Sequence, residues 1–219
     1  MCGRYGIEVT ADDLAEFFGI EVIGEPVALP IPEVRPTDLV PVVVESRREA
    51  GRRLEEARWD LAWPRQKELR RPGPPLINVR SETVVEKFGW AVRHRRCLIP
   101  ATGYWEWTGP KGARQPYLFH DPADAVLAFA GVYSWWSEPG EDDSRRWVLT
   151  TALMTMGAVD HLAAIHDRNP VMLPADLWSE WLDPSTTGDQ SLVEAAVAAG
   201  RGVAERLEFA PVGGQSGLL

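Results

Sequence analysis

The second residue of the chain is a cysteine, and this position offers chemistry that an internal cysteine lacks. Removal of Met1, which the small second side chain permits, would leave a thiol and a free α-amine together on Cys2. With ordinary pKa values of about 8 for the amine and about 8.5 for the thiol, roughly a tenth of each is nucleophilic at neutral pH. Such a 1,2-aminothiol captures aldehydes as a thiazolidine. Taken alone, the position also fits an ordinary second residue.

A second polar segment, residues 77–82, follows an apolar lead and precedes a predicted helix. In an extended chain Asn78 and Arg80 would point to the same face, because they are two residues apart. Arginine can hold a phosphate through two hydrogen bonds, and asparagine can hold an amine or a sugar hydroxyl. The pair indicates a binding face, although a salt bridge at Arg80 and a turn at Asn78 are the simpler interpretation.

A third segment places the carboxylate of Glu106 between Trp105 and Trp107 on a predicted strand. Desolvation there would raise the pKa of Glu106. A carboxyl group that stays protonated near pH 6 or 7 is suited to general-acid work, such as the opening of a sugar ring. The alternation of a strand equally allows Glu106 to face water while the two tryptophans pack.

A fourth segment is the polar loop of residues 165–169, which lies between a predicted short helix and an apolar strand. His166 titrates near neutrality and could move a proton, while Asp167 or Arg168 fixes the loop. By itself, a single histidine in a loop is more often an unreactive surface residue. Each of the four segments is ambiguous alone, and only their combination indicates a reactive site.

Composition limits the class of protein. With 219 residues, 45% of them hydrophobic, the chain fits one domain over residues 1–219. No stretch approaches the roughly 20 apolar residues that span a bilayer, and we expect a cytoplasmic chain with no membrane partner. Cys2 and Cys97 are too few for a disulfide framework or a structural zinc site, and Cys97 is expected to be buried and inert. We expect no metal, no cofactor and a monomer.

A net charge of −9 disfavours broad binding to polyanions, so any nucleic-acid site must be local. Two short basic clusters, at residues 65–71 and 93–96, are candidates for phosphate contacts. Trp59 and Trp63 could provide stacking surfaces for unpaired bases, which bind aromatic side chains with about 1 to 3 kcal/mol each.

The pattern of apolar and turn residues predicts the elements that position these groups. A helix capped by Thr10 is expected through Phe18, and a strand at 39–44 is expected to turn at 49–51 and return over 53–61. Residues 20–38 and 65–75 are predicted to be irregular, and Ser81 is predicted to cap a helix through Phe88. Further strands are expected at 96–100, 103–107, 116–120, 126–135 and 146–153, with a hairpin tip at 138–143, and helices at 158–164, 175–182 and 190–199. The absence of regular β-α alternation favours an α+β fold.

Taken together, residues 1–5, 75–83, 96–107 and 166–173 resemble the SOS-response-associated peptidase (SRAP) family, whose members process abasic sites in DNA. The four segments occur in the order found in that family. The resemblance implies a mixed α+β fold in which strongly curved, mainly antiparallel sheets form a pseudo-barrel with peripheral helices. It also implies a groove that leads single-stranded DNA containing an abasic site to the processed N-terminus.

The resemblance further implies a reaction, in which the aldehyde of an abasic deoxyribose condenses with the Cys2 amine and the thiol closes a stable thiazolidine. Asn78 would orient the N-terminus, Glu106 would act as acid or base, and His166 would assist proton transfer and reversal. Arg4 and Arg80 would hold flanking phosphates, with Trp63 as an aromatic contact to DNA. The peptidase name would refer to autocatalytic removal of Met1, with Glu106 implicated.

Three segments depart from the family pattern: residues 32–37 lack a Tyr-Asn pair, residues 59–65 displace the wedge aromatic, and residues 211–219 lack a Val-Asn segment. These departures concern the grip on DNA more than the chemistry of Cys2. Two other functions stay open. The Met-Cys-Gly start also resembles class II glutamine amidotransferases, in which an N-terminal cysteine attacks an amide. A non-catalytic single-strand binding module, using Trp63 and the arginines, is the other.

Overall fold

The structure, a computed structural model, describes residues 2–24, 28–48, 50–70, 72–110, 112–139 and 145–213. Its central feature is a closed barrel of five strands, in the order β11-β10-β7-β4-β5. These strands are β4 (Leu39–Glu45), β5 (Arg52–Trp59), β7 (Arg96–Ala101), β10 (Leu127–Pro139) and β11 (Arg145–Gly157). A parallel pairing of β5 with β11 closes the ring, and the other pairings in it are antiparallel. Closure removes the exposed strand edges that an open sheet would have.

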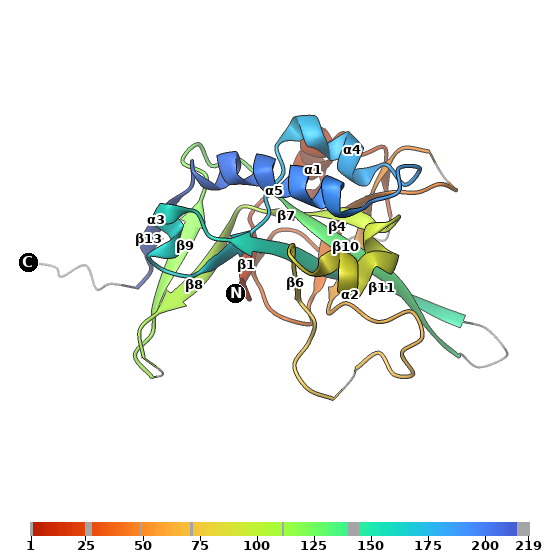
Figure 1. Ribbon diagram of the computed structural model, residues 1–219, viewed down its shortest axis with the longest axis horizontal. Coiled ribbons are helices and arrows are strands. Elements are labelled where there is room, and N and C mark those ends of the chain that lie inside the picture. Colours follow the sequence, from red (N-terminus) through yellow and green to blue (C-terminus); the bar gives the residue numbers. More distant parts are fainter. Residues whose placement is uncertain are drawn as a thin grey trace, which may run out of the picture.

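A second, five-stranded antiparallel sheet packs against one end of the barrel. Its order is β13 (Glu208–Pro211), β9 (Gln115–His120), β8 (Gly103–Thr108), β1 (Tyr5–Ile7) and β3 (Ile31–Val34). The ring of Tyr5 in β1 lies 4.9 Å from the ring of Trp59 and 5.9 Å from that of Phe129, both in the barrel. The N-terminal strand β1 therefore belongs to the second sheet and packs its Tyr5 ring against the barrel, near the middle of the molecule (Figure 1).

Two short strands flank the C-terminal half of β11 and fix the polar segments of interest. The strand β6 (Asn78–Arg80) runs parallel to β11 beside Leu153–Thr155, and β12 (Arg168–Pro170) runs antiparallel beside Thr155–Gly157. Segments nearly 90 positions apart therefore meet at one strand. The short strand β2 (Val22–Ile23) pairs in parallel with the start of β5, at Arg53 and Leu54.

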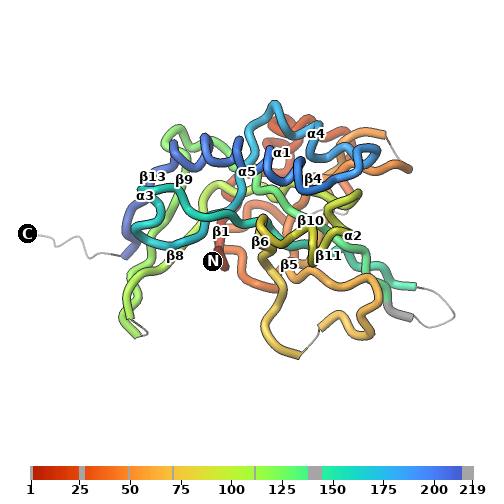
Figure 2. Tube along the Cα trace, viewed as in Figure 1, coloured from red at the N-terminus to blue at the C-terminus, as the bar shows by residue number. Residues whose placement is uncertain are grey.

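The helices are peripheral to the sheets, as the α+β interpretation expected. α1 (Ala11–Phe18), α4 (Trp178–Leu182) and α5 (Gln190–Ala204) lie along one side of the strands, and α2 (Val84–Val92) lies on the other (Figure 1 and Figure 2). A short helix, α3 (Asp160–Ala163), follows β11, and a 3-10 turn (Ala175–Leu177) precedes α4. In the described ranges no helix is both long and apolar enough to cross a membrane.

The fold confirms most of the predicted elements and corrects several. Thr10 caps α1 through reciprocal hydrogen bonds with Asp13, as predicted. Ser81 does not cap α2, because its backbone N–H donates to the Thr155 carbonyl oxygen at 2.9 Å and the helix begins at Val84. The strands β1, β2, β3, β6, β12 and β13 were not predicted, since tertiary pairing rather than local pattern forms them. Most of the predicted tip at 138–143 lies outside the described residues.

Two sequence-based interpretations of surface groups are wrong. Trp59 is fully buried and its indole N–H donates to the Ile77 carbonyl oxygen at 3.0 Å, so it offers no stacking surface. Arg96 is only 2% exposed, and its guanidinium donates to the backbone carbonyls of Val92, Arg93, Trp181, Asp183 and Thr186. This arginine anchors α4 and the following loop to the barrel and cannot be part of a phosphate site. Cys97 is fully buried, as expected.

Candidate functional site

Asn78 occupies the first position of β6, where pairing with Leu153 of β11 fixes its backbone. Val79 is buried while Asn78 and Arg80 are not, which confirms the predicted alternation. The side-chain Nδ2 of Asn78 donates a 2.9 Å hydrogen bond to the backbone carbonyl oxygen of Cys2. Its Oδ1 is buried and has no hydrogen-bond partner among the described residues. Asn78 therefore holds the Cys2 backbone and keeps an acceptor available beside it.

Cys2 is fully buried, with its Sγ 3.8 Å from the backbone carbonyl oxygen of Arg4. Burial, and then the negative charge of Glu106, raise the pKa of the Cys2 thiol far above its usual value. The thiol is therefore protonated at neutral pH, and the expectation that a tenth of it is ionised is wrong for this buried state. To act as a nucleophile, the Cys2 thiol needs either a nearby positive charge that lowers its pKa or an electrophile that reacts with the protonated thiol.

Glu106 lies in β8 with only 4% of its surface exposed, so the buried interpretation is correct and the water-facing one is wrong. Burial raises the pKa of its carboxyl group. The Oε2 of Glu106 lies 4.0 Å from the Nε2 of His166. A carboxyl group with a raised pKa beside an imidazole is an arrangement that can pass a proton in either direction.

The orientation of the His166 ring follows from its hydrogen bonds. The backbone N–H of Arg168 donates to Nδ1 at 3.0 Å, so the neutral ring carries its hydrogen on Nε2, the atom that faces Glu106. The exposed carboxylate of Asp167 lies 3.1 Å from the same Nδ1 and offers an acceptor when the ring is doubly protonated. In both states Nε2–H is directed toward Glu106.

The loop that carries His166 is anchored by an ion pair. The guanidinium of Arg168 contacts both carboxylate oxygens of Glu82, and its Nη2 also donates to the Thr155 carbonyl oxygen at 2.7 Å. The hydrogen bond and charge of Arg168 lower the pKa of Glu82. Because Glu82 follows β6 closely, this clamp ties the His166 segment to the Asn78 segment. Of the two loop anchors proposed from the sequence, Arg168 makes this connection.

Two buried hydroxyl groups at this site were missed by sequence reasoning. Tyr5 and Tyr104 face each other across the pairing of β1 with β8, and neither hydroxyl has a hydrogen-bond partner among the described residues. Burial, followed by the nearby Cys2, raises the pKa of both phenols. The sequence did carry a signal for them. Tyr5 lies close to Cys2 and Tyr104 lies close to Glu106, and each has a hydroxyl group that a phenylalanine would lack.

The three residues predicted to contact DNA differ in their exposure and in their contacts within the protein. Arg80 is exposed. Arg4 stacks over the Trp107 ring at 4.9 Å, and its Nε lies 3.0 Å from an oxygen of Glu33, so a carboxylate offsets part of its charge. Trp63 is 38% exposed, and one face of its ring stacks on Phe88 at 5.2 Å.

The structure thus brings Cys2, Asn78, Glu106 and His166 together from four distant parts of the chain. Chemically the site combines a nucleophile, an amide that holds its backbone, a carboxyl group of raised pKa and an imidazole. Across the described ranges no group of three or more His, Cys, Asp or Glu side chains is arranged to hold a metal ion.

The chain is similar to proteins of one known family. The family model described as SOS response associated peptidase (SRAP) matches residues 1–215. The chain is 31% identical over 192 residues to abasic site processing protein YoqW of Bacillus subtilis (strain 168), covering 85% of this chain and 82% of that protein. It is 28% identical over 205 residues to abasic site processing protein YedK of Escherichia coli (strain K12), covering 90% of this chain and 86% of that protein.

Its fold is also similar to the crystal structure of a phage-related protein from Bordetella bronchiseptica. The TM-score is 0.71 at 27% identity, covering 99% of this chain and 96% of the other. The match of the family model over almost the whole length, together with these relatives, shows that the chain belongs to the SOS response associated peptidase (SRAP) family.

Proposed function

We propose that the chain processes abasic sites in single-stranded DNA by forming a covalent crosslink through Cys2. The observation that carries this proposal is the hydrogen bond from Asn78 to the Cys2 carbonyl oxygen, in a site that also contains Glu106 and His166. Two relatives are named abasic site processing proteins, which supports the same substrate. On this proposal the chain works in the cytoplasm, at the nucleoid when DNA is damaged.

The reaction begins when loss of Met1 exposes the Cys2 amine. An abasic deoxyribose opens to an aldehyde, and the amine adds to the aldehyde carbon. The resulting carbinolamine loses one water to give an imine. The Cys2 sulfur then bonds to the imine carbon, and the thiol proton passes to the nitrogen. The product is a thiazolidine, formed with the net loss of one water and with no change of oxidation state.

The buried thiol sets the order of these steps. Because burial keeps the Cys2 thiol protonated, the amine is the group that attacks the aldehyde first. A protonated imine then places a positive charge next to the sulfur, and such a charge lowers the pKa of a thiol. Ring closure follows on the same residue, where the sulfur and the imine carbon are held close together.

Glu106 and His166 supply the proton transfers. With a raised pKa, the protonated carboxyl of Glu106 can donate to the sugar oxygen during ring opening and to the hydroxyl that leaves as water. His166, whose Nε2 faces this carboxyl, returns the proton and assists reversal. We also assign Glu106 to a self-catalysed removal of Met1. Arg4 and Arg80 would hold the flanking phosphates, and Trp63 would stack on an unpaired base.

The test is incubation of the protein with single-stranded DNA containing one abasic site, followed by denaturing electrophoresis. The proposal predicts a shifted protein–DNA band with abasic DNA and none with intact DNA of the same sequence. Cys2→Ala should abolish the band, while Cys97→Ala, which removes the other buried thiol, should retain it. An undiminished band with Cys2→Ala would overturn the proposal.

A further inference from the structure

A second groove, of about 730 Å³, lies at the opposite end of the barrel from Cys2. Tyr5 contacts the barrel at Trp59 and Phe129, whereas this groove is lined by residues from the turn after β4 and from the start of β7. There β10 and β11 extend past β7 as a two-stranded arm, which forms one wall (Figure 1). The lining residues are Glu45, Ser46, Arg47, Arg48, His94, Arg95, Tyr133, Trp135, Trp147 and Pro184.

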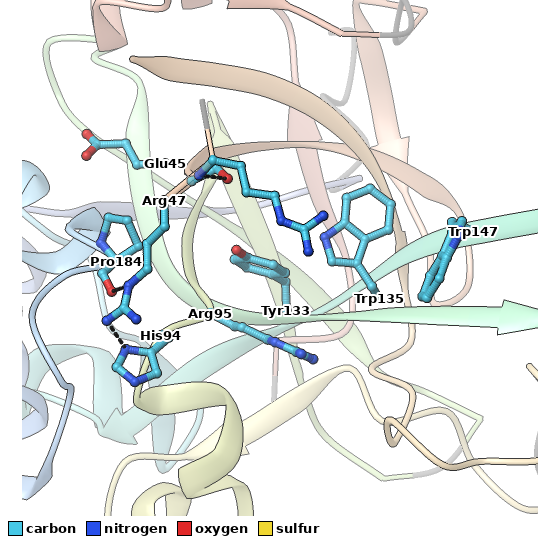
Figure 3. Close-up of a pocket in the computed structure, with 10 residues that line it drawn as sticks. Glu45, Arg47, His94, Arg95, Tyr133, Trp135, Trp147 and Pro184 are labelled. Atoms are coloured by element: carbon cyan, nitrogen blue, oxygen red, sulfur yellow. Dashed lines mark hydrogen bonds between the residues drawn. The ribbon is translucent and has the colours of Figure 1, made fainter. Parts of the chain in front are cut away.

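The arm presents two unusually exposed indole rings to this groove. Trp135 is 41% exposed and Trp147 is 57% exposed. In the antiparallel register Trp135 pairs with Leu149 and Trp147 pairs with Ser137, so the two tryptophans are diagonal neighbours on one face of the arm. Neither ring stacks on another aromatic ring within the described part of the chain. Figure 3 shows Tyr133, Trp135 and Trp147 following one another along the wall.

The opposite side of the groove carries guanidinium groups. Arg47 is held in place because its Nε donates to the Pro184 carbonyl oxygen at 2.7 Å, with an Nη2 contact of 3.3 Å to His94 (Figure 3). Arg48 is exposed. Arg95 also lines the groove; its guanidinium lies 5.9 Å from the Trp90 ring, and its Nη1 has no hydrogen-bond partner among the described residues.

Among the described residues that line the groove, the one carboxylate does not cancel this charge. Glu45 is paired with Arg52 at 3.0 Å, outside the groove lining. Three arginines therefore remain as a local positive patch, on a chain whose net charge is −9. A protein with a net negative charge can bind a polyanion only where cationic side chains are clustered locally, as they are here.

We propose that this groove binds an unpaired nucleic-acid strand, with bases stacked on Trp135 and Trp147 and phosphates held by Arg48 and Arg95. Sequence-tolerant strand binding uses this combination of aromatic faces and backbone-contacting cations. The site goes beyond the function proposed for Cys2, because it uses none of those residues and needs no abasic lesion. The groove would bind an undamaged part of the strand while Cys2, at the other end of the barrel, reacts with an abasic site.

The experiment uses the whole chain and an intact oligothymidylate in which one base is 5-iodouracil. Irradiation joins iodouracil to an aromatic side chain stacked on it, and peptide mass mapping locates the adduct. We expect adducts at Trp135 or Trp147. In equilibrium titrations the double variant Trp135→Ala and Trp147→Ala should bind the oligothymidylate at least tenfold more weakly. Trp147→Phe, which keeps an aromatic ring, should retain most of the affinity.

Charge is tested with Arg48→Glu against Arg201→Glu, an equal change of charge at an exposed position on α5. Arg48→Glu should weaken binding and reduce its salt dependence, and Arg201→Glu should do neither. Adducts confined to Trp63 or Trp107, or equal affinities for the two charge variants, would overturn the proposal. Crosslinking of a short abasic strand to Cys2, assayed separately, should be unchanged in the groove variants. Its failure would count against the Cys2 reaction and not against this groove.

Discussion

The side chain of Asn78 donates a 2.9 Å hydrogen bond to the backbone carbonyl oxygen of Cys2, a residue 76 positions earlier in the chain. The pairing of β6 with β11 makes this contact possible, because it places Asn78 on a fixed strand. Cys2 is thereby tied to β11, the same strand with which β12, just after His166, also pairs. Positioning of this kind lowers the entropic cost of bringing an amine and an aldehyde together.

Asn78→Asp should slow crosslinking to abasic DNA by about fivefold, because a carboxylate cannot donate to the Cys2 carbonyl and a hydrogen bond contributes about 1 kcal/mol. The midpoint of urea unfolding should change little. The rate of adduct formation, followed by quenched time points on denaturing gels, checks this. Asn169→Asp is unsuitable as a control because Asn169 is buried, so the exposed Gln190→Glu serves instead. Equal rates for the two variants would remove Asn78 from the mechanism.

Glu106→Gln should slow crosslinking by about 100-fold or more, since it removes a general acid. It should also change how stability depends on pH. Burial raises the folded-state pKa of Glu106 above its unfolded value, so its favourable contribution is full below the unfolded pKa and is lost as pH rises through the folded pKa. Glu106→Gln should therefore gain stability over the parent as pH rises from about 4.5.

Urea unfolding of both proteins between pH 4 and pH 8 measures this difference. Glu16→Gln, at an exposed position of α1, is the matched control and should follow the parent at every pH. A gap between Glu106→Gln and the parent that stays constant across the range would show that Glu106 is not desolvated in the folded protein.

Glu82→Gln should weaken the clamp that holds the His166 loop, because an amide replaces the carboxylate that Arg168 contacts with two nitrogens. The ion pair is partly exposed, so we expect global stability to fall by no more than about 1 kcal/mol. The crosslinking rate should fall severalfold and its pH profile should shift toward that of His166→Ala. Glu86→Gln, an exposed neighbour on α2, should leave both unchanged. A pH profile identical to that of the parent would mean that the clamp does not position His166.

Arg96→Met should lower the free energy of unfolding by at least about 3 kcal/mol, since it leaves several buried backbone carbonyls without donors. Arg93→Met, three residues earlier and exposed, should change it by less than about 0.5 kcal/mol. Chemical unfolding of the two variants provides the comparison. Similar losses in both would show that the buried guanidinium is not the anchor of α4.

The sequence singled out Cys2, Asn78, Glu106 and His166 because each lies in a short segment whose neighbours are informative. Glu106 between two tryptophans indicated a desolvated carboxyl, and the structure confirms its burial. Relationships between segments were not accessible in the same way. Trp59 and Trp63 look alike in the sequence, yet one is buried in the barrel and the other is exposed. Trp59 is the last residue of β5, whereas Trp63 lies in the loop that follows this strand.

The missed features share a cause in long-range pairing. The strand β6 has three residues and forms because β11 provides a partner. The burial of Arg96 depends on carbonyl groups more than 80 positions away. Tyr5 and Tyr104 lie opposite each other only because β1 and β8 pair. Local propensity carries no information about such contacts, which loop closure and sheet register determine.

The most direct test of the Cys2 reaction is the intact mass of the protein before and after incubation with single-stranded abasic DNA, without a reducing agent. The account predicts that the starting mass lacks Met1 and that the product gains the mass of the oligonucleotide minus one water. Cys2→Ala, which can form only an imine, should give a stable adduct only after borohydride treatment. A borohydride-independent adduct of that mass with Cys2→Ala, or no adduct from a protein that has lost Met1, would contradict the account.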